Sequence, residues 1–205
     1  MVAGGITGNT AYRVIHGAGR MKVWTKLSAI CVLAAALVAC SQPVDIVVSQ
    51  ASFGPITVAT PFDPDAIAKL LPTRKVESAI SSELQPGERV IRVSDGATSL
   101  FEAYPSRDGA TVQSVLVLDQ SIHDDKGVHV GSGLLEAIPD GDISACNPGR
   151  GEKSGRIFCA QPGSMHIIYE LQGAAPAPDG MLPDSAVFAS WTVTAMLWDG
   201  GEPAP

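Results

Sequence analysis

Basic residues are scarce in this chain, and they are unevenly placed. Of its 205 residues only 14 are Lys or Arg, against 21 Asp or Glu, which gives a formal net charge of -7. Four of the basic residues precede residue 40, where no acid occurs, so the remainder holds 10 basic and 21 acidic residues, a net charge of -11. We expect no nucleic-acid partner, because non-specific affinity for DNA or RNA comes from Lys and Arg that displace counterions from phosphates.

Sequence signatures of common enzymes are also missing. The chain has no G-x-S-x-G, no G-x-x-x-x-G-K-[ST], no G-x-G-x-x-G and no H-E-x-x-H. The nearest approach to a nucleophile is Gly131-Ser132-Gly133, but a small polar residue before a helix is typical of an N-cap. We therefore expect no catalytic residue, no enzymatic activity and no cofactor.

Long apolar runs are absent, with one exception near the N-terminus. Residues 27–38 form a run of twelve residues, all apolar except one Ser, directly after a short basic start at residues 21–26. A membrane-spanning helix needs roughly 20 apolar residues, so this run has the length of a signal peptide. We expect residues 1–20 to be an upstream extension absent from the native protein, and residues 21–39 to be a signal peptide.

The apolar run ends at Leu37-Val38-Ala39-Cys40. This pattern resembles the lipobox of bacterial lipoproteins, which implies lipid attachment at Cys40; an ordinary buried thiol is the alternative. A lipoprotein of this kind carries three acyl chains, and each methylene buried in the membrane contributes about 0.8 kcal/mol. Two lipid chains are enough for stable anchoring, so three would hold the protein at its membrane. Ser41 stands where an Asp would favour the inner membrane, so the resemblance implies an outer-membrane anchor facing the periplasm, with residues 40–52 as a lipidated tether.

Only two cysteines follow Cys40, and they are Cys146 and Cys159. The Gly-, Pro- and charge-rich stretch between them is typical of a hairpin-like loop, and an oxidising periplasm favours a disulfide. Closing a ring of about 14 residues contributes roughly 3 kcal/mol in the chain-entropy model. A metal site is the alternative, but two Cys without a nearby His pair or second Cys pair make weak zinc spacing.

Turn and strand signals outnumber helix signals in the rest of the chain. Asp63 followed by Pro64 predicts a helix that ends at Pro72, and Ser132 predicts the cap of a second short helix. Strands are predicted at 45–48, 55–59, 90–93, 99–104, 111–118, 128–130, 165–171 and 188–198. We therefore expect one α+β domain over residues 53–199, with a mostly antiparallel sheet, one or two short helices and a flexible tail at 200–205.

Alternation assigns faces to the two C-terminal strands. In the last one, Trp191, Val193, Ala195 and Leu197 are predicted on one face, with Thr192, Thr194, Met196 and Trp198 on the other; in the strand before it, Met165, Ile167, Tyr169 and Leu171 are predicted on the apolar face. His166 lies on the polar side, where Glu170 can pair with it. A ligand groove of His166, Tyr169 and Trp198 is one hypothesis, and ordinary core packing of the aromatic residues is the alternative.

A second cluster carries side chains that ligate metals. It comprises Asp119, His123, Asp124, Asp125 and His129. Imidazole suits transition metals and carboxylate suits harder ions, but an Asp-rich turn between strands is usually a solvated connection. We therefore expect no metal site.

Several short stretches follow one another in a specific order between residues 53 and 199. They are Ala59-Thr60-Pro61-Phe62, Val117-Leu118-Asp119, Gly127-Val128-His129-Val130-Gly131, Gly163-Ser164-Met165-His166-Ile167-Ile168-Tyr169, Gly180-Met181-Leu182-Pro183 and Trp191-Thr192-Val193. With Cys146 and Cys159, this order resembles the RpoE-regulated lipoprotein family, envelope-stress-controlled lipoproteins of Gram-negative bacteria with a domain of unknown function. The resemblance implies an α+β periplasmic domain, a structural disulfide and an outer-membrane lipid anchor, and it assigns no catalytic residue.

Taken together, these observations favour a non-enzymatic outer-membrane lipoprotein. We expect it to act in envelope homeostasis or the stress response through contacts with a protein or another envelope component, with the membrane as its partner through the N-terminal lipid. A periplasmic small-ligand or metal-binding module is the second hypothesis, and a hydrolase is the third. A deep apolar pocket lined by several convergent polar groups favours the second hypothesis, and a filled core with only flat exposed surfaces favours the first.

Overall fold

The computed structural model describes residues 45–201, and an eight-stranded antiparallel sheet is its central element. The sheet order is β2-β3-β4-β5-β10-β9-β8-β7. This confirms the predicted α+β fold with a mostly antiparallel sheet. The strands are β2 (Lys75–Ile80), β3 (Arg89–Asp95), β4 (Thr98–Pro105), β5 (Val112–Val117), β7 (Asn147–Pro148), β8 (Arg156–Ala160), β9 (Ile167–Gly173) and β10 (Trp191–Asp199).

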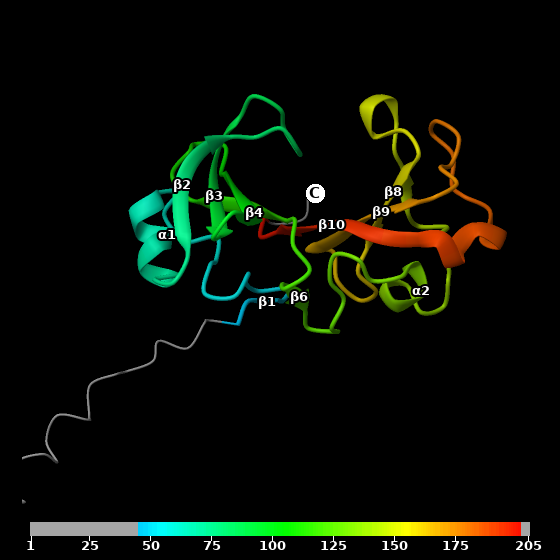
Figure 1. Ribbon diagram of the computed structural model, residues 1–205, viewed down its shortest axis with the longest axis horizontal. Helices are drawn as coiled ribbons and strands as arrows, with labels where there is room; N and C mark the ends of the chain where they lie inside the picture. The colour runs from blue at the N-terminus through cyan, green and yellow to red at the C-terminus, as the bar shows by residue number, and fades with distance from the viewer. Residues whose placement is uncertain (1–44, 202–205) are drawn as a thin grey trace, which may run out of the picture. The chain divides into compact units, whose positions relative to one another are not determined.

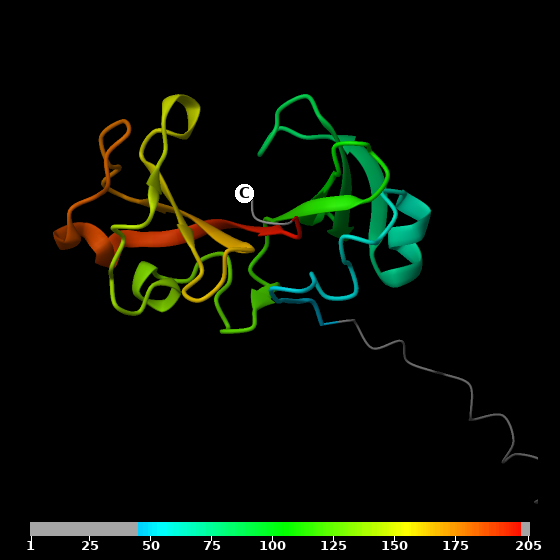
Figure 2. The ribbon, with the colours of Figure 1, turned by 180° about the vertical axis from the view of Figure 1, so that it is seen from behind.

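Short elements cover one side of this sheet. A two-stranded parallel sheet joins β1 (Val47–Val48) to β6 (His123–Asp124). It lies on the same side as α2 (Leu134–Ala137), below the ribbon of β10 in Figures 1 and 2, and α1 (Pro64–Leu70) packs beside β2. Two 3-10 helices complete the described chain, η1 (Gly151–Lys153) and η2 (Ser185–Ser190). No helix within residues 45–201 has the length and apolar character needed to span a membrane.

Helix α1 begins and ends as its sequence predicts. The Asp63 carboxylate accepts a hydrogen bond from the Ala66 backbone N–H at 2.9 Å, and Pro64 occupies the first turn, where its missing N–H has no intrahelical partner to lose. Ile67 is completely buried, and Leu71 closes the helix by donating its N–H to the Ile67 carbonyl. The helix thus presents one apolar stripe to the core.

Two glycines set the predicted hairpin turns. Gly96 and Gly109 have φ of 57° and 74°, a region that strongly favours glycine, and they connect β3 to β4 and β4 to β5. The predicted central position of 111–118 is also confirmed, since β5 has neighbours on both sides and Val115, Leu116 and Val117 are all buried. Strand β2 was not predicted, because Lys75–Ile80 is a half-polar edge strand without a clear apolar alternation.

The sheet has one extensively buried face and one partly open face. The main core lies on the first, where side chains of β3, β4, β5, β8, β9 and β10 pack against α1, α2 and the segment from Ile46 to Ile56. Ile46 and Val48 belong to this core, so packing begins within the segment expected to be a tether. The open face carries a smaller cluster of Val90, Tyr104, Leu116 and Ala195.

Strand β10 changes face part-way along its length, which corrects the predicted alternation. Val193 pairs with Leu171 and Ala195 with the adjacent Glu170, so Thr194 is an extra residue in a β-bulge. Trp191 and Val193 therefore share the core face with Met196 and Trp198, whereas Ala195 lies with the open-face cluster, against which Leu197 packs. A strict period of two fails here because one residue is not paired.

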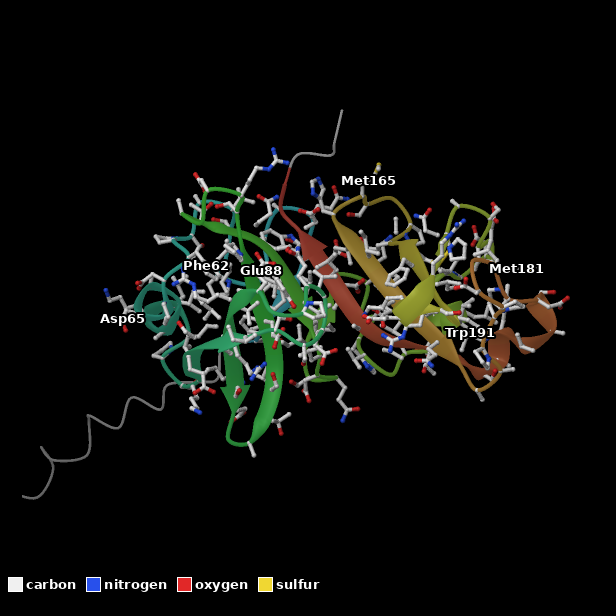
Figure 3. All side chains as sticks on the ribbon, turned by 90° about the horizontal axis from the view of Figure 1, so that it is seen from above. Phe62, Asp65, Glu88, Met165, Met181 and Trp191 are labelled. Carbon is white, nitrogen blue, oxygen red and sulfur yellow. A yellow bond between two sulfur atoms is a disulfide. The ribbon has the colours of Figure 1, made fainter. Side chains whose placement is uncertain are left out.

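Four other local predictions are wrong. Residues 55–59 and 128–130 make only isolated bridges, at Ile56 and His129. Ser132 does not cap α2, whose N-cap is Gly133; the buried Ser132 hydroxyl accepts from the His129 N–H at 3.2 Å instead. Met165 precedes β9, and 74% of its surface is exposed. Figure 3 shows it at the outside of the molecule.

The predicted disulfide is confirmed. Cys146 and Cys159 are bonded, with their Cα atoms 4.4 Å apart. The stretch between them is a hairpin, since β7 pairs with β8 through Asn147 opposite Phe158 and Pro148 opposite Ile157. The bridge therefore fixes the two-residue edge strand β7 to the main sheet. Cys40, with the predicted upstream extension and signal peptide, lies outside the described residues.

Candidate functional site

A polar pocket of about 420 Å³ lies on the open face of the sheet, over β2, β3 and β4. Its size falls within the range of roughly 300–1,000 Å³ that ligand pockets occupy. None of its lining residues is His or Cys. We call it the β2–β4 pocket, and its lining comprises Lys75, Glu77, Ser82, Glu83, Arg92, Ser94, Gly96, Ala97, Ser99, Glu102 and Leu118.

Glu102 is the deepest charged side chain of this pocket, with 1% of its surface exposed. One carboxylate oxygen accepts from Arg92 Nη2 at 2.6 Å and Nε at 3.1 Å. The other accepts from the hydroxyls of Ser81 and Tyr104, each at 2.9 Å. Both oxygens therefore have partners, as a buried carboxylate requires.

Strand register explains why these groups meet. Glu77 lies opposite Arg92, and Arg92 lies opposite Glu102, so three charges of alternating sign form one row across β2, β3 and β4. Directly opposed charges of unlike sign stabilise antiparallel strands. The next row joins Lys75, Ser94 and Ser99, because a register shift between Val93 and Ser94 brings Ser94 opposite Ser99.

Tyr104 lies next to Glu102 on the open face of the sheet. Burial, reinforced by the neighbouring Glu102, raises the pKa of the Tyr104 phenol to about 12. Tyr104 therefore stays protonated and donates to Glu102, while its oxygen is within 3.3 Å of the Leu84 backbone N–H. This network attaches the β2–β3 loop to the open face.

The hydroxyl of Ser99 differs from its neighbours. Its oxygen is buried and has no hydrogen-bond partner among residues 45–201, and Ser99 lines the β2–β4 pocket. The Nη1 of Arg92 likewise takes part in none of the hydrogen bonds of Arg92 to Glu102 and the Ile80 carbonyl. The pocket thus offers donors to a polar group, and in its lining the Ser82 hydroxyl donates to Glu83 Oε1 at 3.2 Å.

The three residues expected to form a ligand groove do not share a site. Tyr169 and Trp198 are fully buried, on the core face of the sheet. The Tyr169 hydroxyl donates to the Asp124 carboxylate. His166 is half-buried, and its Nδ1 lies 2.8 Å from the Asp199 carbonyl oxygen. The two aromatic side chains, Tyr169 and Trp198, are therefore part of the core, as the alternative prediction had it.

Asp124 organises the loop that contains the cluster of His and Asp residues at 119–129. The buried carboxylate accepts from the backbone N–H groups of Lys126 and Val128 at 2.9 and 2.8 Å, and from Gln161 Nε2 at 2.7 Å, besides the Tyr169 hydroxyl. His123 and His129 each direct Nδ1 to a backbone carbonyl at 2.9 Å. Within residues 45–201 no three His, Cys, Asp or Glu side chains are grouped to hold a metal ion.

Glu170 pairs with basic residues from η1 and β8. Its carboxylate accepts from Lys153 Nζ at 3.2 Å and from Arg156 Nη1, and the Thr194 hydroxyl is 3.4 Å away. The predicted pair with His166 is therefore replaced by a buried ion pair on the open face. Glu170 and Glu102 are both buried there, but Glu170 does not line the β2–β4 pocket.

The sequence alone did not bring the pocket residues together. Arg92 and Glu102 each interrupt an otherwise apolar run, but a regular hairpin with Asp95 opposite Thr98 would place Arg92 opposite Phe101. The register shift between Val93 and Ser94 brings Arg92 opposite Glu102 instead. Ser81 was missed because the strand that leads to it was not predicted.

Comparison with known proteins gives a family without an assigned activity. The family described as "Protein of unknown function (DUF1131)" matches residues 41–200. The chain belongs to this family. A curated relative, "Uncharacterized protein YfeY" of Escherichia coli strain K12, is 26% identical over 161 residues, 74% of this chain and 78% of that protein. The crystal structure of the uncharacterized protein yfeY from Escherichia coli is similar, with a TM-score of 0.57 and 25% identity over 75% of this chain and 99% of that chain.

The expected membership in a family with a domain of unknown function is thereby confirmed. The DUF1131 match begins at residue 41, and it includes the β2–β4 pocket, the disulfide and β10. Regulation by envelope stress and lipid attachment are matters of proposal.

Proposed function

We propose that this DUF1131 protein is a lipoprotein of the outer membrane that faces the periplasm and acts in envelope homeostasis through contacts with a protein or another envelope component. The observation that carries the proposal is the lipobox-like Leu37-Val38-Ala39-Cys40, which ends only six residues before Ile46, the first buried core residue within the described residues 45–201. Six residues extend over at most about 20 Å, so an anchor at Cys40 holds the domain at the membrane surface.

The disulfide supports secretion. Disulfides persist in oxidising compartments such as the bacterial periplasm and are rare in the cytosol. Cys146 and Cys159 are buried and bonded at the edge of the sheet, where the bridge secures β7. A signal peptide at residues 21–39 delivers the chain to the compartment in which this bond forms.

The buried carboxylates all have hydrogen-bond donors beside them, and this supports a non-enzymatic role. Glu102, Asp124 and Glu170 each accept hydrogen bonds from neighbouring donors. A general base needs a free lone pair within reach of a substrate proton. These three groups instead stabilise the two sheet faces, so contact with a partner is the activity that the described residues support best.

The test of the anchor is palmitate labelling of Cys40→Ser expressed from Met21. We expect this variant to lose the label and to stay unprocessed or become soluble. Cys31→Ser is the matched control, because Cys31 lies inside the apolar run and should leave labelling unchanged. Normal labelling of Cys40→Ser would overturn the proposed lipid attachment.

A small-ligand-binding module is the second candidate, and one observation favours it. The β2–β4 pocket has a volume of about 420 Å³ and carries charged groups of both signs. A contact surface requires no such pocket.

A further inference from the structure

We propose that the edge strand β2 pairs with β2 of a second copy of this chain, so that the two main sheets join into one. This inference goes beyond the proposed function and does not depend on a lipid anchor. It rests on the free outer edge of β2 and on the symmetry of its residues about Ser78. Within residues 45–201 β2 stands at one end of the sheet order, and β3 is its neighbour on the inner side.

The backbone of β2 leaves every second residue facing away from β3. The Ser81 N–H donates to the Glu88 carbonyl at 2.8 Å, so the ladder to β3 uses the odd-numbered residues of β2. The outward groups are therefore the N–H and C=O of Val76, Ser78 and Ile80. Within the described chain one further hydrogen bond reaches these groups, from Arg92 Nη2 to the Ile80 carbonyl at 3.4 Å, and a carbonyl has a second lone pair.

The two ends of the sheet differ in how they are protected from pairing. Strand β7, at the other end, has two residues, includes Pro148 and is fixed by the disulfide. Short strands and prolines are common devices against edge pairing. Strand β2 has six residues, no proline and no register shift against β3. Helix α1 contacts β2, but none of its residues hydrogen-bonds the outer edge among residues 45–201. This edge is therefore a template for another strand.

The outward residues of β2 are self-complementary about Ser78. When Ser78 lies opposite the partner's Ser78 in an antiparallel pair, each Val76 lies opposite an Ile80. These residues share the core side of the sheet, since Val76 packs against the main core. Ile80 is apolar, yet 62% of its surface is exposed, and a valine of the second copy would cover it. Such a two-fold contact is the commonest kind in homodimers.

Strand length and charge select this register over its neighbours. With the two-fold axis at Ser78, all three outward residues find partners within β2. An axis at Ala79 leaves Val76 opposite a residue beyond the strand, and an axis at Glu77 does the same to Ile80. The axis at Glu77 also sets two carboxylates directly opposite each other, which destabilises a strand pair.

The charges on β2 permit two copies to approach. Glu77 pairs with Lys75 at 2.8 Å on the open face, so the strand carries no net charge. In the proposed register Glu77 lies opposite the small partner's Ala79 rather than opposite another acid. The net charge of -7 on the whole chain opposes association, but salt at about 0.15 M screens charges beyond about 8 Å.

The test is disulfide cross-linking of the full chain in intact cells with a copper–phenanthroline oxidant. Ser78→Cys places two Cys residues opposite each other with Cα atoms about 5.5 Å apart, within the range of a disulfide. Ile80→Cys is the matched control on the same edge, because its two Cys residues would lie about 14 Å apart. We expect a dimer band about tenfold stronger for Ser78→Cys than for Ile80→Cys or for the parent chain.

A second set of variants tests the backbone contacts at the two-fold axis. The double variant Val76→Cys, Ile80→Cys should cross-link, because residue 76 faces residue 80 of the second copy. Adding Ser78→Pro should abolish this band, since it removes an outward N–H that the ladder to β3 does not use. Circular dichroism of the purified proline variant should remain native.

Three results would overturn the proposal. They are the absence of a dimer band from Ser78→Cys above that of the parent, equal bands from Ser78→Cys and Ile80→Cys, and cross-linking of Ser78→Cys to a different protein in place of a second copy. In the last case a strand of another protein occupies the edge. Palmitate labelling at Cys40 is independent of each result, so failure of the dimer and failure of the anchor are distinguishable.

Discussion

Both tyrosines of the described chain donate to a buried carboxylate, Tyr104 to Glu102 and Tyr169 to Asp124. Burial is the larger cause of their raised pKa values and the carboxylate the next for Tyr169; the pKa of Tyr104 is about 12, and that of Tyr169 is raised further. The two sites lie on opposite faces of the sheet. At the scale of residues, each face of the sheet therefore has one buried hydrogen bond from a protonated tyrosine hydroxyl to a carboxylate.

Ultraviolet absorbance measured against pH tests whether the two tyrosine hydroxyls stay protonated in the folded chain. In a chain beginning at Ser41, which lacks Tyr12, we expect no tyrosinate absorbance at pH 10 while circular dichroism remains native. The unfolded phenols titrate near 10, so the stability from Tyr104 is complete below that pH and falls by about 1.4 kcal/mol per unit as pH rises from about 10 towards 12. Tyrosinate formed at pH 10 in a native chain would contradict the expectation.

At the scale of elements, the bulge of β10 allows a deletion to be tolerated. Without Thr194, residues Trp191, Val193, Met196 and Trp198 fall at alternate positions, and the pairing of Val193 with Leu171 and Ala195 with Glu170 becomes regular. We expect the Thr194 deletion to fold, with a loss of roughly 1–3 kcal/mol from the missing hydroxyl contacts and altered twist.

The matched control is deletion of Thr192, which lies in the regular part of the strand. This deletion moves Trp191, the first residue of β10, to the opposite face and should destabilise the chain more than the Thr194 deletion, because a fully buried Trp side chain leaves the core. Urea unfolding of the two variants gives the comparison. Equal stability of both would show that the bulge does not set the faces of β10.

The same elements show what the sequence can predict. Helix α1 and the hairpins at Gly96 and Gly109 depend on local chemistry, a capping carboxylate or a turn with positive φ, and these were predicted. The bulge at Thr194 and the partners of Asp124 depend on pairing between distant segments, as Gln161 and Tyr169 illustrate. The alternation of apolar and polar residues does not show where a strand contains an unpaired residue. Edge strand β2 was not recognised because its two faces differ too little in apolar character.

At the scale of the whole molecule, the disulfide contributes through the ring that it closes. Reduction should lower the free energy of unfolding by roughly 2–5 kcal/mol, and each 1 kcal/mol should lower the melting temperature by roughly 2–4 °C. Thermal unfolding with and without a phosphine reductant measures the difference. A variant with Cys146→Ala and Cys159→Ala should not respond to the reductant. Two freely alkylated thiols in protein from the periplasm would contradict the bridge.

Strand β10 is the last strand of residues 45–201, yet it lies between β5 and β9 near the middle of the sheet. Figure 1 shows it joining β2, β3 and β4 on one side to β8 and β9 on the other. The hairpins on each side form from neighbouring residues, but they unite only when Trp191–Asp199 is inserted between them. The order of synthesis therefore delays completion of the core until Trp191–Asp199 has been made, so a nascent chain that stops short of β10 holds two separate sets of hairpins and no joined sheet.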